Sequence, residues 1–113
     1  MHEMAIAESI LATLEEQAGA QDYARVRVVR LVIGPLAGVE VEALRFSFDV
    51  VVKGTLADGA CLEIESPAAT AWCHDCAREV NIAQRYDPCP HCGGHRLRIT
   101  SGDEMRIKDL EVE

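Results

Sequence analysis

The chain has 113 residues, which fits one small domain with room for an insert. Its 19 acidic and 11 basic residues give a net charge of −8, and this argues against nucleic-acid binding, which needs a surface rich in lysine and arginine. Glutamates interrupt the apolar residues near the N-terminus, and no apolar run approaches the roughly 20 residues of a membrane span. We therefore expect a cytoplasmic protein without an export signal or membrane contact, in a reducing compartment.

The first predicted element is an amphipathic helix over residues 4–18. Apolar residues recur there at intervals of three and four, and Gly19 provides a stop signal. Core packing explains this apolar stripe better than a docking face for a partner. The stripe consists of Met4, Ala7, Ile10, Leu11, Leu14 and Ala18.

The residues before this helix, Met1, His2 and Glu3, form a candidate metal site. The α-amine, a backbone nitrogen and the His2 imidazole can form fused chelate rings around one ion, and Glu3 can add a carboxylate oxygen or its backbone nitrogen. Such donors suit Ni²⁺ or Cu²⁺. Binding should weaken as pH falls, because the amine and the imidazole must be deprotonated. Taken alone the signal is weak, since one histidine near a start methionine is commonly a solvated terminal residue.

A β-strand is predicted over residues 24–33, where β-branched residues dominate. Both of its faces carry apolar side chains, so we expect a central position in a sheet, or a bulge near Val28 and Val29. Its arginines can be interpreted as a basic patch or as a solvated, ion-paired face, and the acidic composition favours ion pairing. These arginines are Arg25, Arg27 and Arg30.

Three further elements complete the expected main domain. A second helix spans about 40–53, a half-buried strand spans 61–66, and a last strand over 105–112 changes parity at Asp109–Leu110, which indicates a bulge. Cys61 has no partner at ligand spacing and is expected to be a spare thiol packed near a strand end. The fold class is therefore α+β, a small three-stranded sheet with two helices and an inserted zinc-ribbon module.

Two Cys-x-x-Cys pairs, separated by twelve residues, are the strongest motif of the chain. This spacing is typical of one tetrahedral Zn²⁺ bound by four thiolates, here those of Cys73, Cys76, Cys89 and Cys92. A closed four-cysteine site has no open coordination position, so zinc would be structural. Two disulfides or one redox-active pair are the alternatives, but neither explains why two pairs recur with turn residues suited to zinc knuckles.

Pro67 marks the expected boundary of the zinc module. The predicted domains are residues 1–67 with 101–113, and residues 68–100 as the zinc ribbon. Strands are expected over 79–86 and 96–100, with an apolar cover made by Trp72, Val80, Ile82, Leu97 and Ile99.

Three histidines lie close to the cysteine pairs in sequence: His74, His91 and His95. They could support the ligands, substitute for them or sense pH, but solvated positions explain them more simply. The chain contains no phosphate loop, nucleophile elbow or His-Glu-x-x-His motif. An enzyme is therefore not the leading hypothesis.

In its motifs and their order, the chain resembles the nickel metallochaperones of nickel–iron hydrogenase maturation, the HypA/HybF family. The resemblance covers essentially the whole chain. It is carried by Met1-His2-Glu3, Leu31-Val-Ile-Gly34, Phe46-x-Phe48-Asp49, the two cysteine pairs, and Gly102-Asp-Glu-Met-Arg-Ile107 through Leu110-Glu-Val112.

The resemblance implies that Met1, through its amine, His2 and Glu3 bind Ni²⁺, while the four cysteines bind structural Zn²⁺. It also implies delivery of nickel, with a partner GTPase, to the hydrogenase large-subunit precursor, and in some organisms a role in urease maturation. Two rival functions remain at this point. One is a zinc-ribbon adaptor for protein or nucleic acid, which the net charge opposes for nucleic acid. The other is a thiol-redox enzyme, which constitutive binding of metal by the thiolates would exclude.

Overall fold

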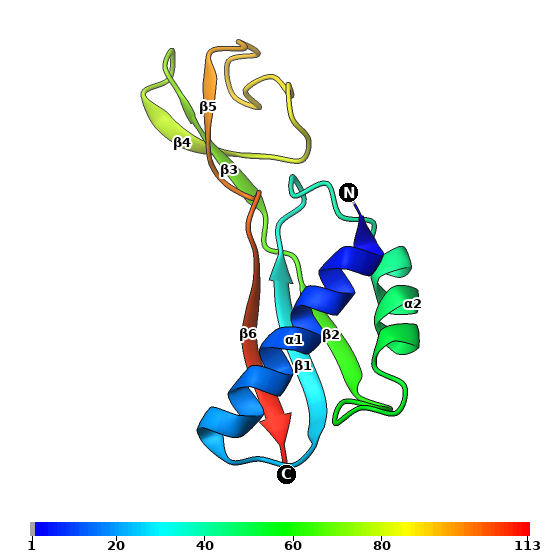
Figure 1. Cartoon of the computed structure of the whole chain (residues 1–113). Helices are drawn as coiled ribbons and strands as arrows, with labels where there is room; N and C mark the ends of the chain where they lie inside the picture. Colours follow the sequence, from blue (N-terminus) through cyan, green and yellow to red (C-terminus); the bar gives the residue numbers. More distant parts are fainter. Residues whose placement is uncertain (1) are drawn as a thin grey trace. The chain divides into compact units, whose positions relative to one another are not determined.

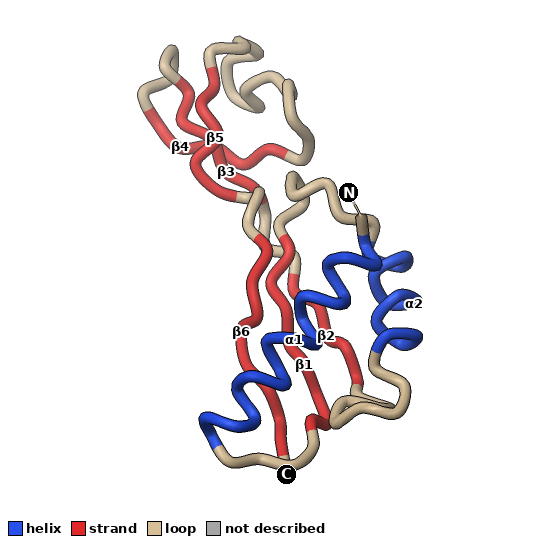
Figure 2. The backbone as a smooth tube through the Cα atoms, viewed as in Figure 1, coloured by secondary structure: helices blue, strands red, loops and turns tan. Residues whose placement is uncertain are grey.

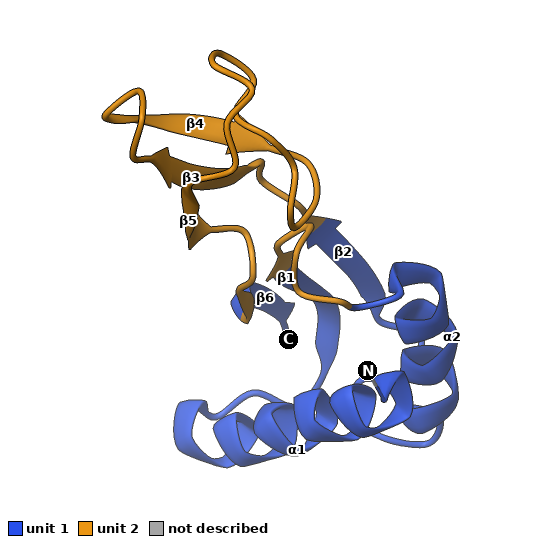
Figure 3. Ribbon diagram, turned by 90° about the horizontal axis from the view of Figure 1, so that it is seen from above, with its two compact units in different colours: residues 1–31, 39–64, 107–113 blue, residues 32–38, 65–106 orange. Residues whose placement is uncertain are grey.

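The computed structural model describes residues 2–113 as two helices and two three-stranded sheets (Figures 1 and 2). The strand order is β2-β1-β6 in the first sheet and β4-β3-β5 in the second. The chain forms two compact units (Figure 3): unit 1 contains residues 1–31, 39–64 and 107–113, and unit 2 contains residues 32–38 and 65–106. The elements are α1 (Glu3–Gln21), β1 (Val26–Ile33), α2 (Val41–Val51), β2 (Cys61–Glu65), β3 (Ala69–Cys73), β4 (Arg78–Ile82), β5 (Leu97–Ser101) and β6 (Met105–Val112).

Unit 1 is built around β1, the central strand of its sheet. α1 crosses one face of this sheet and α2 lies beside α1 (Figures 1 and 3). The largest fully buried side chains of the unit come from all three of these elements, among them Leu14, Val29, Leu44 and Phe48. The predicted α+β class and the central position of this strand are confirmed.

The predicted extent of the first helix was less accurate. α1 continues beyond Gly19 to Gln21 and ends at Asp22, which adopts a left-handed conformation at φ 58° and donates its N–H to the Ala18 carbonyl. A glycine near a helix end costs only about 1 kcal/mol relative to alanine, so packing of the preceding turns carries the helix past it. The buried face is also shifted, since Ile6 is buried whereas Met4 is 41% exposed.

An ion-paired network on the sheet confirms the expected role of two arginines. Arg30 lies in the central strand and binds Asp109 at 2.8 Å, Glu63 at 3.0 Å and Glu111. These carboxylates, Asp109 first, raise the pKa of the Arg30 guanidinium. Arg27 pairs with Glu113 at 2.9 Å. The carboxylates thus neutralise Arg27 and Arg30, whereas Arg25 donates to the Asp58 carbonyl at 3.3 Å.

Unit 2 is organised by β3, which pairs antiparallel with β4 on one side and β5 on the other. Sequence reasoning missed this strand, because alanine is depleted in strands and Ala69-Thr-Ala-Trp gives no β-branched alternation. The small residues have a structural use: Ala69 and Ala71 are fully buried against Val80 and Ile82. Trp72, expected in this apolar cover, is only half-buried.

Residues 32–38 belong to unit 2, where they run beside residues 102–104. Gly34 donates its N–H to the Glu104 carbonyl at 2.8 Å, and Leu36 donates to the Gly102 carbonyl at 2.7 Å. A Cβ at position 34 would lie 2.1 Å from the Gly102 oxygen, so the close approach of these two segments requires glycine. The predicted domain boundaries assigned both segments to the other domain, and the division into independent domains stays a prediction.

Two smaller expectations had different outcomes. Cys61 is the first residue of β2 and is exposed, so the expected packing of its thiol was wrong. Ile107 and Leu110 of β6 are both half-buried although they are three residues apart, which matches the predicted change of parity. No helix within residues 2–113 is long and apolar enough to cross a membrane.

Candidate metal centres

Two tight turns bring the four cysteines together. Cys73 is the last residue of β3, and the turn that follows reaches β4 through Ala77, which adopts φ 52°. The second pair lies in the loop before β5. There Gly93, at φ 73°, donates to the Cys89 carbonyl at 2.8 Å, and the Cys89 N–H is donated to the Gly94 carbonyl at 2.8 Å. Each turn therefore directs two sulfurs to one side, as the spacing predicted.

The sulfur positions match one tetrahedral zinc ion. All four Sγ atoms lie within 4.8 Å of one another. The Cys73–Cys92 and Cys76–Cys89 sulfurs are 3.7 and 3.8 Å apart. A tetrahedron with Zn–S bonds of about 2.3 Å has sulfur–sulfur edges of about 3.8 Å, whereas a disulfide needs about 2.05 Å. The donor set and its geometry therefore fit Zn²⁺, and all four cysteines are free thiols.

Backbone amides around the cluster favour thiolates. Cys76, His91 and Gly94 donate their N–H groups to the sulfurs of Cys73, Cys89 and Cys92, each at 3.4 Å. Hydrogen bonding from the Cys92 backbone lowers the pKa of the Cys89 thiol to about 7. Hydrogen bonding with the Cys92 side chain raises the pKa of Cys76 to about 12. A positive ion at the centre of the cluster would favour the thiolate form of all four side chains.

An ion pair links the two turns beside the cluster. Asp75, inside the first Cys-x-x-Cys pair, accepts a hydrogen bond at 2.9 Å from Arg96, which follows the second pair. His74 also donates its backbone N–H to the Arg96 carbonyl at 3.0 Å. A Cβ at Gly94 would lie 3.0 Å from the Asp75 carboxylate and 3.3 Å from the Cys92 sulfur. The two contacts of Arg96, with the Asp75 carboxylate and the His74 N–H, link the two cysteine pairs. The spacing of the cysteines in the sequence did not predict them.

The three histidines near the zinc site are all exposed. Within residues 2–113, the four cysteines are the one group of three or more His, Cys, Asp or Glu side chains close enough to share an ion. His74, His91 and His95 therefore do not add a further cluster of that kind to the described part of the chain.

The N-terminal candidate site is described only in part. Met1 lies outside the described residues, so the predicted contribution of its amine has no structural description. His2 is exposed and forms the N-cap of α1, where its carbonyl accepts the Ile6 N–H at 3.1 Å. Glu3 begins α1, and its carboxylate accepts the backbone N–H of Glu40, the N-cap of α2, at 3.1 Å.

The Glu3–Glu40 hydrogen bond joins the beginnings of two helices that are 37 residues apart in sequence. This backbone hydrogen bond lowers the pKa of the Glu3 carboxyl. The hydrogen bond therefore favours the ionised form of the Glu3 carboxyl. Sequence reasoning named Glu3 but missed Glu40, because no local pattern connects the two positions.

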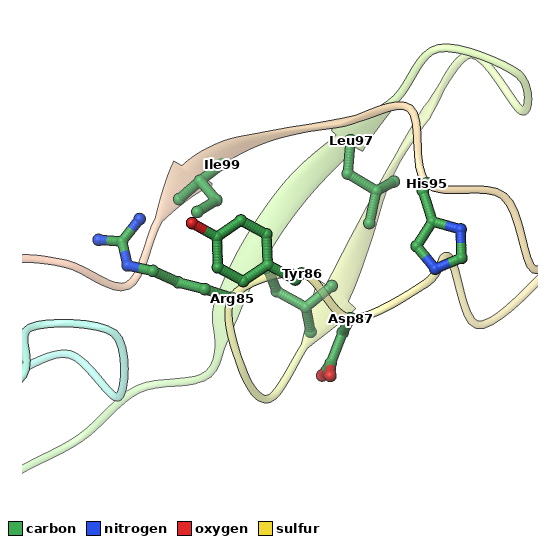
Figure 4. A pocket seen from close by; sticks show the side chains of 7 residues that line it. Arg85, Tyr86, Asp87, His95, Leu97 and Ile99 are labelled. Atoms are coloured by element: carbon green, nitrogen blue, oxygen red, sulfur yellow. The ribbon is translucent and has the colours of Figure 1, made fainter.

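A separate hollow of about 240 Å³ lies in unit 2 (Figure 4). Ile82, Leu97 and Ile99 form its apolar lining, and none of the cysteines borders it. Two of its polar side chains already serve the local fold, since the Asp87 carboxylate accepts the N–H groups of Ala83 and Gln84 and Arg85 donates to the Leu36 carbonyl. We assign no ligand to this hollow.

The fold and the cysteine cluster together indicate the general class of this protein. A four-sulfur cluster with zinc geometry on a small ribbon, carried by an α+β unit, is typical of a zinc-ribbon metal-binding protein. The comparison with known families then gives the particular assignment. Residues 1–112 match the family described as hydrogenase/urease nickel incorporation metallochaperone, HypA, and the chain belongs to this family.

Relatives in sequence and in structure agree with that assignment. The chain is 59% identical to the hydrogenase maturation factor HypA of Azotobacter vinelandii over the full length of both proteins. It is 61% identical to that of Azorhizobium caulinodans over 99% of each. The solution structure of the Ni metallochaperone HypA from Helicobacter pylori has a TM-score of 0.68 at 25% identity, covering 99% of this chain and 97% of that one. A second solution structure of a HypA protein has a TM-score of 0.72 at 26% identity, covering 100% and 97%.

Proposed function

We propose that the chain binds Ni²⁺ through the Met1 amine, His2 and Glu3, and that it delivers the ion, with a partner GTPase, to the hydrogenase large-subunit precursor in the cytoplasm. The observation that carries the proposal is membership, over residues 1–112, of a family of nickel-incorporation metallochaperones. In this proposal the four cysteines bind structural Zn²⁺, and a urease client is the alternative destination of the nickel.

The local geometry supports the N-terminal residues as the nickel ligands. His2 is exposed, and Glu3, the next residue in the chain, has its carboxylate held by the Glu40 N–H. Nitrogen and oxygen donors of this kind suit Ni²⁺, whereas the sulfur cluster suits Zn²⁺. A site built at a chain end from backbone groups and one imidazole has few supporting contacts, so the ion can be transferred to a better-formed site.

Cu²⁺ should bind the same ligands more tightly than Ni²⁺, as the Irving–Williams order requires. Selection of nickel therefore depends on which metal is available and on which partner accepts it. The zinc-ribbon adaptor for nucleic acid is disfavoured, because the net charge of −8 repels phosphate.

A nickel titration of zinc-loaded protein tests the ligand assignment. A variant with one extra residue before Met1 displaces the α-amine from His2 but keeps every side chain, so we expect it to lose the tight nickel site. His2→Ala should lose the site as well. His74→Ala, which removes an exposed imidazole next to a cysteine, serves as the control and should bind nickel as the wild type does. Equal nickel affinity in the wild type and all three variants would contradict the assignment. The candidate nickel ligands would then be His74, His91 and His95.

Delivery is tested separately from binding. Cells that depend on this chain for hydrogenase activity should lose that activity with the His2→Ala variant and regain it when excess nickel is supplied. The His2→Ala protein must first be shown to have lost nickel binding. If hydrogenase activity then does not change, the delivery role is contradicted, although the assignment of the nickel ligands still stands.

A further inference from the structure

The outer surface of α2 exposes an aromatic side chain that the fold does not use. Phe46 is 69% exposed, whereas Phe48, two residues later in the same helix, is fully buried. Val50 lies one helical turn beyond Phe46 and is 44% exposed. These are the only two phenylalanines of the chain, so one serves the core and the other faces solvent.

Acidic side chains surround this apolar pair. Glu42 and Asp49 occupy helical positions four before and three after Phe46, and both are exposed. Arg45, the one cation of α2, donates to the Leu62 carbonyl and lies 3.7 Å from the Glu42 carboxylate, so it is engaged within the fold. Glu42, paired with Arg45, and Asp49 therefore both lie close to the apolar centre at Phe46 and Val50.

The adjacent helix extends the same charge. α1 carries four glutamates and no lysine, arginine or histidine between Glu3 and Gln21. The Glu3–Glu40 hydrogen bond holds the beginnings of α1 and α2 together, and Met4 near that junction is 41% exposed. In contrast, Arg27 and Arg30 of the sheet are ion-paired with carboxylates. Across α1 and α2, six acidic residues are thus opposed by one basic residue, Arg45, so negative charge predominates on the helices.

We propose that the exposed face of α2, centred on Phe46 and Val50, is a docking site for a basic amphipathic helix of a partner protein. Apolar side chains of that helix would cover Phe46 and Val50, and its lysines or arginines would lie against Glu42 and Asp49. Aromatic residues at the centre of a polar rim are the usual energetic centres of such interfaces. The complementary charge selects the partner and speeds encounter. This site contains neither the sulfurs nor the proposed nickel ligands, so its binding does not require either metal function.

The test uses the zinc-loaded full chain and a synthetic 18-residue helical peptide of leucine and lysine in amphipathic order. The controls are a scrambled peptide of the same composition and one with glutamate in place of lysine. We expect the lysine peptide alone to shift the backbone NMR signals of residues 42–53, with affinity falling as salt rises. The double variant F46A/V50A should weaken its binding at least tenfold.

A matched double variant keeps this result specific. Y86A/V112A removes an exposed aromatic and a valine that is 43% exposed, close to the 44% of Val50, from elsewhere on the surface. It should bind the lysine peptide as the wild type does. Equal loss in both double variants, equal binding of the scrambled peptide, or no binding up to about 1 mM peptide would overturn the proposal.

The same protein samples distinguish other occupants of the face. Sedimentation that shows self-association in the wild type and its loss in F46A/V50A would make the occupant a second copy and overturn the assignment to a basic partner. Binding of zwitterionic phosphatidylcholine vesicles that F46A/V50A abolishes would make the face a lipid contact, with the same consequence. Nickel affinity of F46A/V50A, measured in parallel, should equal that of the wild type, so failure of this proposal and failure of the nickel assignment give different results.

Discussion

Single residues at the start of the chain have roles that only their contacts reveal. Glu3 was expected to act as a nickel ligand, and that assignment stays a prediction. The structure gives the same carboxylate a second contact, since it accepts the Glu40 N–H at 3.1 Å. The two roles are compatible, because an ionised carboxylate has two oxygens and about four acceptor positions.

The first prediction concerns the pH dependence of this contact. The Glu40 N–H hydrogen bond favours the ionised form of Glu3 and lowers its pKa below the ordinary 4.5. Its contribution to stability is therefore complete above pH of about 4.5 and is lost as pH falls through the lower folded-state value. The Glu40 amide NMR signal should shift with a midpoint below 4.5, and Glu3→Gln should abolish that step. A midpoint at or above 4.5 would contradict the hydrogen bond.

The second prediction compares two glycines. Gly34→Ala should destabilise the zinc-loaded protein by about 1–3 kcal/mol, because its Cβ would meet the backbone of Gly102 at 2.1 Å. Gly19→Ala is the control, since no atom lies within 4 Å of its Cβ in the last turns of α1, and it should stabilise by about 0.5–1 kcal/mol. Chemical denaturation of both variants measures the difference, and equal effects would show that residues 34 and 102 do not approach this closely.

At the scale of elements, burial separates residues that the sequence presents alike. Phe46 and Phe48 lie in the same helix with the same side chain, and both belong to the motif that carried the family resemblance. A helical pattern can place Leu44 and Phe48, four residues apart, on one buried face. It could not show that Ser47 would also be buried while Met4 of α1 would be exposed, because those outcomes depend on what each helix packs against.

The third prediction uses this contrast within α2. Phe48→Ala should lower the free energy of unfolding by about 3–5 kcal/mol, since a fully buried ring would leave a cavity. Phe46→Ala should change it by no more than about 0.5 kcal/mol, because its ring is 69% exposed. Thermal or urea unfolding of the two variants checks both values. A large loss with Phe46→Ala would mean that this ring supports the fold and is not free for a partner.

At the scale of the whole molecule, two units with different sources of stability share one chain. Unit 1 buries large side chains from two helices and a sheet. Unit 2 has a small core that includes Cys73 and Cys89, so part of its interior is the sulfur cluster itself. A core this small gains much of its folding energy from a metal when one binds.

The fourth prediction follows from that difference. Removal of zinc by a strong chelator should abolish the amide protection of β3, β4 and β5 while α1 and α2 keep theirs, and added Zn²⁺ should restore the lost protection. Cys76→Ser and Cys89→Ser should behave like the chelated protein, whereas Cys61→Ser, at an exposed thiol outside the cluster, should not. Hydrogen exchange followed by NMR measures each element. Loss of protection throughout both units would contradict independent domains.

The sequence by itself determined the class of fold, the grouping of the four cysteines and the family resemblance. It could do so because helical periodicity, β-branched runs and Cys-x-x-Cys spacing are local patterns with direct physical meaning. Only the tertiary structure decided the strand at Ala69–Cys73, the pairing of Glu3 with Glu40, the approach of Gly34 to Gly102 and the exposure of Phe46. Each of these depends on residues distant in sequence, and no local pattern records which distant group a side chain or a backbone amide will meet.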